Sequence, residues 1–120
     1  MLINFEDERP IFVQIAEGIE DAILSGAFLE ESQIPSTTEI SVSYKINPAT
    51  ALKGINLLVD SGILFKKRGV GMFVAPGATK KLIEKRRNLF YENYITRLID
   101  EAKRLGIAQT EITARSEERR

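Results

Sequence analysis

Apolar side chains recur at helical spacing along the first part of the chain. Pro10 is expected to open a helix in which Ile11, Ile15, Ile19 and Ile23 share one face. The outer part of this helix is expected to carry three acidic side chains: Glu17, Glu20 and Asp21. We interpret these carboxylates as a solvated face, because the chain has no histidine that could complete a metal site with them.

A connector follows this first helix. Gly26 is suited to the left-handed residue that ends a helix. Residues 27–34 then connect it to the next helix. Three of their apolar side chains are expected to fill the core: Phe28, Leu29 and Ile34.

Two helix starts lie eleven residues apart in the next stretch. Ser36 followed by Glu39 is a capping box, in which the serine hydroxyl and the carboxylate each accept a hydrogen bond from a backbone N–H. Asn47 followed by Pro48 is a second start, because asparagine caps helices and proline suits the first helical position. Two short helices joined by a tight turn are the outline of a helix-turn-helix.

The first of these two helices is expected over residues 36–44. Ile40 and Tyr44 would face inward, whereas Ser41 and Ser43 would face outward. The second is expected from Pro48 to about Ser61, and Gly62 would end it.

Opposite faces of this last helix differ in chemistry. The inward stripe is Ala51, Ile55, Leu58 and Val59, with Leu52 at one edge. The free face is Ala49, Thr50, Lys53 and Asn56. Small and polar side chains suit close approach to a major groove, where they can meet a thymine methyl group or a base-edge acceptor. An ordinary amphipathic helix explains these residues equally well when they are taken alone.

A basic hairpin is predicted next. Residues 63–67 and 72–75 are expected to form two strands joined by a turn at residues 68–71. Three consecutive cations lie at this turn, followed by glycines that allow close approach to another surface: Lys66, Lys67, Arg68, Gly69 and Gly71. A solvated turn that happens to be basic is the plainer interpretation. Beside a helix-turn-helix, contact with phosphates is the better account.

A long helix is expected from about Ala78 to Leu105, after the break at Pro76-Gly77. Its apolar stripe is too wide and aromatic for a lone helix, so we predict that it pairs with a second copy of the chain. The predicted dimerisation residues are Leu82, Leu89, Phe90, Tyr94, Ile95, Leu98, Ile99, Ala102 and Leu105. Gly106 would break the helix, and residues 107–120 would fold back with Ile107 and Ile112 as anchors. Packing entirely within one chain is the alternative.

The predicted fold class is therefore α+β, mainly α. Residues 1–76 would form a winged helix-turn-helix domain and residues 77–120 a two-helix dimerisation tail. A chain of 120 residues can bury a modest core of this kind.

The formal net charge is zero, but the charges are segregated. Residues 1–31 carry eight acidic side chains against Arg9 alone, a net of −7. Residues 32–91 carry ten basic against three acidic side chains, a net of +7. A neutral protein with one basic flank can dock on a polyanion through that flank.

Composition also limits the chemistry. The chain has no cysteine and no histidine, which removes the usual groups of metal hydrolases and of thiol or imidazole nucleophiles. We therefore expect no enzyme, no cofactor and no metal. No apolar run is long enough to cross a bilayer, and the acidic N-terminus does not resemble a signal peptide. A cytoplasmic protein without a membrane partner is the expectation.

Four segments in unbroken order resemble the N-terminal winged-helix domain of GntR-family transcription regulators. These segments lie within residues 10–75: PIFVQIAEGIEDAILSGAF, IPSTTEIS, INPATALKGINLLVDSGIL and KKRGVGMFV. The short two-helix tail and the Asn-Pro-x-Thr motif look like the YtrA subfamily. That resemblance implies a dimerising tail, no large effector domain, and control of operons for ABC-type transporters.

The resemblance also implies which residues contact DNA: Ser36, Thr38, Asn47, Ala49, Thr50, Lys53, Arg68 and Gly69. Together with Thr37, Lys66, Lys67 and Gly71 they form the predicted DNA interface. The chain departs from the family where Thr38 replaces a common arginine and Asn47-Pro48 replaces Ser-Arg. Because two basic contacts are missing, the operator sequence of relatives does not transfer.

The predicted function is a dimeric regulator, most simply a repressor, that binds a palindromic operator in double-stranded DNA. The alternative is a winged-helix module that contacts proteins and does not bind DNA. No cluster of residues identifies a site for a small-molecule effector, so the existence of an effector stays open.

Overall fold

The computed structural model describes residues 3–119. The chain divides into two compact units, residues 1–83 and residues 84–120. This boundary lies inside a helix, whereas the sequence places it after residue 76. The difference arises because Ala78 and Leu82, in the first turns of that helix, are fully buried in the core of the first unit.

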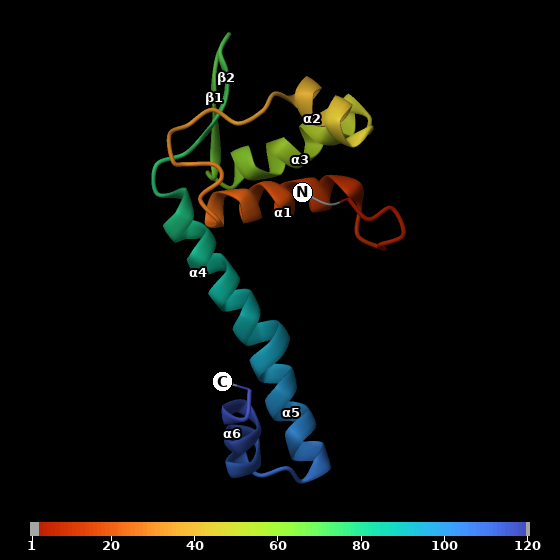
Figure 1. Cartoon of the computed structure of the whole chain (residues 1–120), viewed down its shortest axis with the longest axis vertical. Coiled ribbons are helices and arrows are strands. Elements are labelled where there is room, and N and C mark those ends of the chain that lie inside the picture. The colour runs from red at the N-terminus through yellow and green to blue at the C-terminus, as the bar shows by residue number, and fades with distance from the viewer. Residues whose placement is uncertain (1–2, 120) are drawn as a thin grey trace. The chain divides into compact units, whose positions relative to one another are not determined.

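The first unit is built on helix α1 (Ile11–Leu24), which packs against α3 (Pro48–Asp60). Helix α2 (Thr37–Tyr44) contacts α3 as well, so that α3 lies between α1 and α2 (Figure 1). The core is one apolar cluster to which every element of the unit contributes; its fully buried larger side chains are Ile15, Ile19, Ile55, Leu64, Val74 and Leu82.

A small antiparallel sheet follows α3. Strands β1 (Leu64–Lys67) and β2 (Gly71–Val74) pair in a register that sets Phe65 opposite Phe73, with the two rings stacked at 5.7 Å between centroids. This confirms the predicted hairpin, although β1 begins one residue later than expected and β2 begins and ends one residue earlier.

The connector before α2 runs along β2. Glu31 N–H donates to the Val74 carbonyl at 2.8 Å, Val74 N–H to Ser32 at 2.9 Å, and Ile34 N–H to Met72 at 3.0 Å. These bonds fix the hairpin to the segment that leads into α2, because the connector satisfies backbone groups on the outer edge of β2.

Three side chains of this unit differ from the sequence prediction. Ser41 is buried rather than exposed, and its hydroxyl donates to the Thr38 carbonyl at 2.9 Å, so burial leaves it satisfied. Glu20 is also buried. The buried face of α1 is wider than its isoleucine stripe, and it includes Ala16 and Glu20 beside that stripe. Leu29 was expected in the core and is 65% exposed, because the chain turns there and Ser32 bonds back to the Leu29 carbonyl.

A helical segment runs from Ala78 to Leu105 as α4 (Ala78–Phe90), a π-helical turn η1 (Tyr91–Ile95) and α5 (Thr96–Leu105). The predicted helix is therefore present, with one wide turn inside it. Gly106, at φ +67°, ends α5, and α6 (Gln109–Glu117) forms the last helix. Within residues 3–119, no helix combines the length and the apolar character that a bilayer span requires.

The second unit leaves most of its large apolar side chains in contact with solvent. Ala102 is its one buried apolar residue among those described, and Ile112 is half-buried. Side chains exposed by 42–66% are Leu89, Phe90, Tyr91, Tyr94, Leu98, Ile99 and Leu105. The second unit by itself therefore leaves this stripe largely uncovered. Leu82 does not belong to it, because Leu82 is buried in the first unit.

Helices α1 and α3 approach closely at Gly54. A Cβ atom built there would lie 2.7 Å from the Phe12 carbonyl oxygen and 3.0 Å from Ile15 Cγ2. Backbone cannot give way as a flexible side chain can, so only glycine fits this point of α3.

We expect Gly54→Ala to destabilise the protein. Alanine favours the helix by up to about 1 kcal/mol, but overpacking against backbone costs about 1–3 kcal/mol, so the free energy of unfolding in urea should fall. Asn56→Ala, on the exposed face of the same helix, is the control and should stay within about 0.5 kcal/mol. Equal or higher stability of Gly54→Ala would contradict the close packing.

Candidate nucleic-acid interface

The helix-turn-helix is built by backbone geometry and two side-chain caps. Ser36 and Glu39 form the predicted capping box at the start of α2, with hydrogen bonds of 3.1 and 3.2 Å. Lys45 adopts a left-handed conformation, φ +54°, that ends α2. Asn47 then accepts a hydrogen bond from Ala49 N–H at 2.8 Å and starts α3. The sequence identified both helix starts correctly.

The exposed side of α3 begins at its first turn. Ala49, Lys53 and Asn56 are exposed as predicted, whereas Thr50 is half-buried. The ammonium of Lys53 lies 4.1 Å from the centroid of the Phe12 ring of α1. A cation over an aromatic face is attracted to it, so Lys53 rests at the flank of α3 beside α1.

Leu52 was placed at the edge of the inward stripe and is 42% exposed. It lies three residues after Ala49 and four before Asn56, which puts all three on one face of the helix. The sequence prediction did not include Leu52 among the interface residues. Its helical spacing was the available signal, but apolar character argued for burial.

The hairpin presents the basic run at its tip. Lys66, Lys67, Arg68 and Gly69 are exposed. The Lys67 ammonium lies 4.3 Å from the Phe73 ring centroid, so the stacked pair of phenylalanines supports it.

Gly69 and Gly71 have different roles in the hairpin. Gly69 turns the chain at φ +77°, with open space where a side chain would be. Gly71, at φ +146°, is half-buried, and a Cβ there would lie 2.4 Å from Gln33 Nε2. Gln33 Nε2 donates to the Val70 carbonyl at 2.9 Å, so the connector holds the tip of the hairpin through a side chain that the sequence prediction did not single out.

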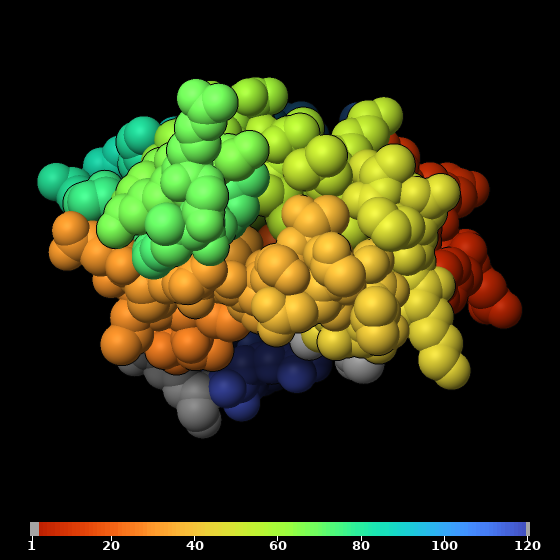
Figure 2. All heavy atoms as spheres, turned by 90° about the horizontal axis from the view of Figure 1, so that it is seen from above, coloured from red at the N-terminus to blue at the C-terminus, as the bar shows by residue number. Residues whose placement is uncertain are grey.

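The start of α2, the start of α3 and the hairpin are exposed together on one face of the first unit (Figure 2). We call this surface the candidate DNA face; its residues are Ser36, Thr37, Thr38, Asn47, Ala49, Thr50, Leu52, Lys53, Lys66, Lys67, Arg68 and Gly69. Eleven of the twelve predicted residues belong to it, and Gly71 supports it from the hairpin. Thr37 and Thr50 are half-buried and offer less surface than their neighbours.

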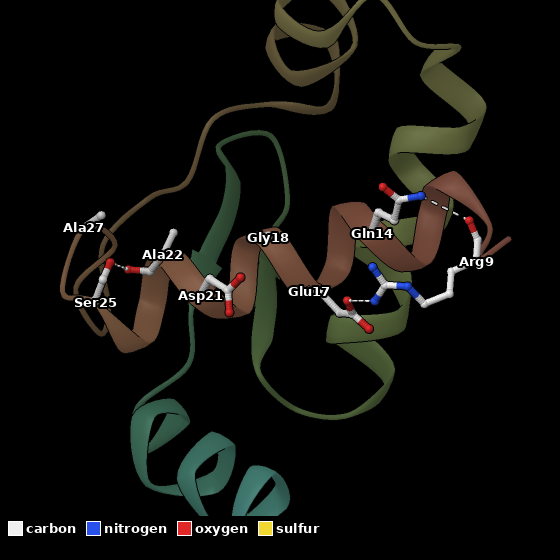
Figure 3. Close-up of a pocket in the computed structure, with 8 residues that line it drawn as sticks. All are labelled: Arg9, Gln14, Glu17, Gly18, Asp21, Ala22, Ser25 and Ala27. Atoms are coloured by element: carbon white, nitrogen blue, oxygen red, sulfur yellow. Dashed lines mark hydrogen bonds and ion pairs between the residues drawn. The ribbon is translucent and has the colours of Figure 1, made fainter. Parts of the chain in front are cut away.

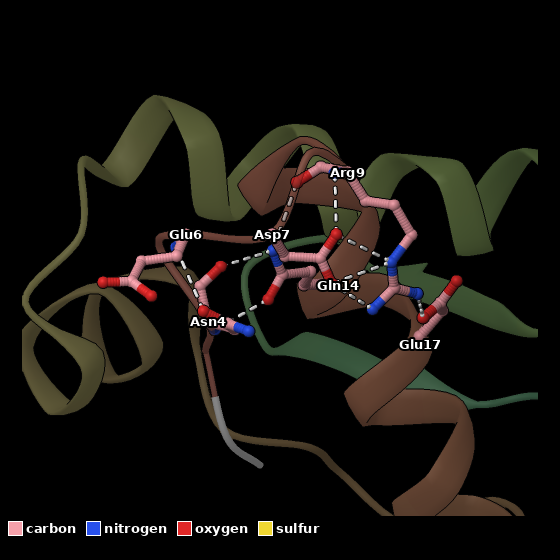
Figure 4. Close-up of polar contacts among 6 residues, drawn as sticks. All are labelled: Asn4, Glu6, Asp7, Arg9, Gln14 and Glu17. Atoms are coloured by element: carbon pink, nitrogen blue, oxygen red, sulfur yellow. Dashed lines mark hydrogen bonds and ion pairs between the residues drawn. The ribbon is translucent and has the colours of Figure 1, made fainter.

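The outer side of α1 carries an open groove of different character. Its lining includes Arg9, Glu17 and Asp21, with small side chains from the rest of the helix (Figure 3). Arg9 is the one cation of residues 1–31, and it pairs with Asp7 at 2.9 Å and with Glu17 (Figure 4). The hydrogen bond from Arg9 lowers the pKa of Asp7. This groove is therefore acidic with its cation neutralised, and it is unsuited to a polyanion.

The segment before α1 is held by Gln14, which is buried. Its side-chain amide donates to the Asn4 carbonyl at 2.9 Å and to the Arg9 carbonyl at 3.1 Å, and accepts from Asn4 N–H at 2.8 Å (Figure 4). These bonds order the acidic segment along α1. In the described part of the chain, no group of side chains is arranged to hold a metal ion.

Comparison with known proteins shows what this arrangement belongs to. The family model described as "Bacterial regulatory proteins, gntR family" matches residues 12–74. The chain belongs to the GntR family. The match begins in α1 and ends at the last residue of β2, so it includes the whole helix-turn-helix and the hairpin.

Two relatives from Bacillus subtilis cover most of the chain. The chain is 25% identical over 109 residues to the uncharacterized HTH-type transcriptional regulator YhcF, covering 91% of this chain and 88% of that protein. It is 28% identical over 98 residues to the HTH-type transcriptional repressor YtrA, covering 82% and 75%. Other relatives are longer, and the chain spans 34% and 31% of the length of two of them.

Solved structures agree with this family. A GntR-family regulator from Bacteroides thetaiotaomicron is 35% identical, with a TM-score of 0.76 over 90% of this chain and 94% of that chain. The DNA-binding domain of AraR in complex with operator ORX1 is 31% identical, with a TM-score of 0.55 over 62% of this chain and 90% of that chain. The relatives are GntR-family transcription regulators, a class of proteins that are generally not enzymes.

Glu30 joins the hairpin region to α4. Its carboxylate accepts from Gly77 N–H at 2.6 Å and from Thr79 N–H at 3.3 Å. These backbone hydrogen bonds lower the pKa of Glu30, because they favour its charged form. Glu30 therefore caps the start of α4 from 47 residues away while its side chain stays exposed.

This cap predicts a pH-dependent contribution to stability. Because the folded-state pKa of Glu30 is lowered, its contribution is present above the ordinary value of 4.5 and lost as pH falls through the folded value. We expect Glu30→Gln to melt at a lower temperature than the parent protein at pH 7, with the gap closing as the pH falls below 4.5 and through the lowered folded-state pKa. Glu31→Gln is the control and should melt like the parent. A gap that stays constant with pH would contradict the cap.

Proposed function

We propose that this chain is a dimeric transcription regulator that binds operator DNA through the candidate DNA face. The observation that carries the proposal is the joint exposure of the α3 start and the cationic hairpin on one face. A helix that enters a major groove needs neighbouring cations to hold the phosphates on either side. The AraR domain, which is similar to this chain, was solved in complex with an operator, and this supports DNA binding by a chain of this fold.

Charge placement favours this docking direction. Lys66, Lys67 and Arg68 are exposed at the hairpin, whereas Arg9, the one cation of residues 1–31, is paired with carboxylates. Because α3 lies between α1 and α2, the acidic groove on the outer side of α1 does not compete for the polyanion. Affinity should fall steeply with salt, since neutralised phosphates release counterions.

A second copy of the chain is proposed as the partner of the second unit. Seven large apolar side chains of residues 84–105 are exposed, which is more than a solvated helix of a small protein tolerates. A two-fold dimer would present two α3 helices to DNA, so the operator would be roughly palindromic with half-sites one helical turn apart. The similarity to the HTH-type transcriptional repressor YtrA favours repression. A transporter operon as the target rests on the resemblance of the short tail and the Asn-Pro-x-Thr motif to the YtrA subfamily.

Arg68→Ala should weaken binding to every DNA sequence alike. We expect about tenfold loss of affinity, because a charge-assisted contact with phosphate is removed, and a lower dependence on salt. Fluorescence anisotropy on operator and random duplexes measures both. Arg104→Ala, an exposed arginine of the second unit, is the matched control and should bind like the parent. Unchanged affinity of Arg68→Ala would rule out the hairpin as a phosphate contact.

The variant Lys53→Ala tests whether Lys53 contacts a DNA base or only packs over the Phe12 ring. If Lys53 leaves the Phe12 ring to reach a base, the variant should discriminate less between operator and random duplex. Equal discrimination would place Lys53 outside base contact. If the parent protein binds no duplex at low ionic strength, the alternative of a module for protein contact takes precedence.

Leu98→Glu should dissociate the dimer. A buried charge without a partner is costly at an apolar interface, and Leu98 is 47% exposed in the single chain. Sedimentation equilibrium should give twice the chain mass for the parent protein and the single-chain mass for the variant. Leu29→Glu, at an exposed leucine of the first unit, should remain dimeric. A monomeric parent protein would contradict the proposed pairing.

A further inference from the structure

We propose that the chain reads thymine methyl groups through apolar side chains of α3, with Leu52 as a residue that determines specificity. The inference rests on the proposed function and goes beyond it by naming the chemistry of base recognition. The evidence is the face of α3 that carries Ala49, Leu52 and Asn56.

The first two turns of this face present methyl groups rather than hydrogen-bonding groups. Ala49 is exposed, and Leu52 is 42% exposed. The first side-chain amide on this face is that of Asn56, which lies one helical turn after Leu52. Among the neighbouring polar side chains, the Asn47 side-chain carbonyl oxygen caps Ala49 N–H, the Lys53 ammonium lies over the Phe12 ring, and Thr50 is half-buried. The part of α3 that enters a groove first is therefore apolar.

Base edges in the major groove offer one feature that suits such a surface. The C5 methyl group of thymine is apolar, whereas the other groups at the floor of the groove donate or accept hydrogen bonds. Contact with that methyl group would remove both Leu52 and the methyl from water. A thymine opposite Leu52 would therefore strengthen binding. A cytosine there would weaken it, because the cytosine amino group would be left without a hydrogen-bond partner.

The same helix provides an internal comparison. Leu57 is 41% exposed, nearly the same as Leu52, but five residues along an α-helix place it on a different face. If any exposed leucine of α3 increased the affinity for DNA, Leu52 and Leu57 would both contribute. Recognition of thymine by the Ala49–Leu52 face involves Leu52 alone.

The test uses duplexes that the full chain selects from a random-sequence library. The selected duplex is synthesised twice, once with dT and once with dU throughout, which removes the methyl groups and keeps base pairing. Each lost methyl contact should cost about fourfold in affinity, so a site with one such methyl in each half should bind at least about tenfold more weakly as dU. Fluorescence anisotropy measures the ratio of the two dissociation constants.

Variants assign the effect to Leu52. Leu52→Ala should bind the dT duplex more weakly and bring the dU-to-dT ratio close to one, whereas Leu57→Ala should keep the ratio of the parent. Circular dichroism establishes that both variants are folded. A ratio near one for the parent protein overturns the inference and leaves DNA binding intact. An unchanged ratio in Leu52→Ala overturns the role of Leu52, and failure to select any duplex overturns the proposed function together with the inference.

Discussion

The close packing of α1 on α3 at Gly54 is the contact on which the candidate DNA face depends. Because no side chain separates the two helices there, the Phe12 carbonyl oxygen lies only 2.7 Å from the point where a Cβ atom would be. That contact fixes which side of α3 is buried, and so which side is left for Ala49, Leu52 and Asn56. It also brings the Phe12 ring under the Lys53 ammonium. A looser pairing of the helices would rotate α3 and change the residues that it presents.

The connector between α1 and α2 holds the other half of the face. Its backbone bonds to β2, Gln33 reaches the tip of the hairpin, and Glu30 caps α4. The hairpin is therefore not a free loop, although it is only two strands wide and an isolated hairpin is marginal. A segment of about four residues thus links the start of α2, the cationic tip and the helix that leads to the second unit.

Local signals made most of the fold predictable. The capping box at Ser36, the Asn47-Pro48 start and Gly106 act through neighbouring residues, and the structure has all three. The errors have a common cause, since burial depends on which elements pack together. Ser41 is polar and was expected at the surface, but it is buried with its hydroxyl hydrogen-bonded. Leu29 is apolar and was expected in the core, but it is exposed.

In the candidate site, too, features that depend on neighbouring residues were predictable and features that depend on distant residues were not. Its cations and glycines were predictable because the basic run and the hairpin turn are local in sequence. The contribution of Glu30 was not, because its partners lie 47 and 49 residues away. Leu52 was missed because an apolar residue next to a buried stripe is normally assigned to the core. Leu82 was assigned to the tail because the spacing of a helix does not tell which partner covers each turn.

Hydroxyl-radical footprinting of the full chain on the promoter of its own gene tests the account most directly. The account predicts two protected segments on one side of the duplex, separated by about one helical turn, that appear together as protein is added. Uniform cleavage along the promoter at low ionic strength, or a single protected segment that never acquires a second, would contradict it.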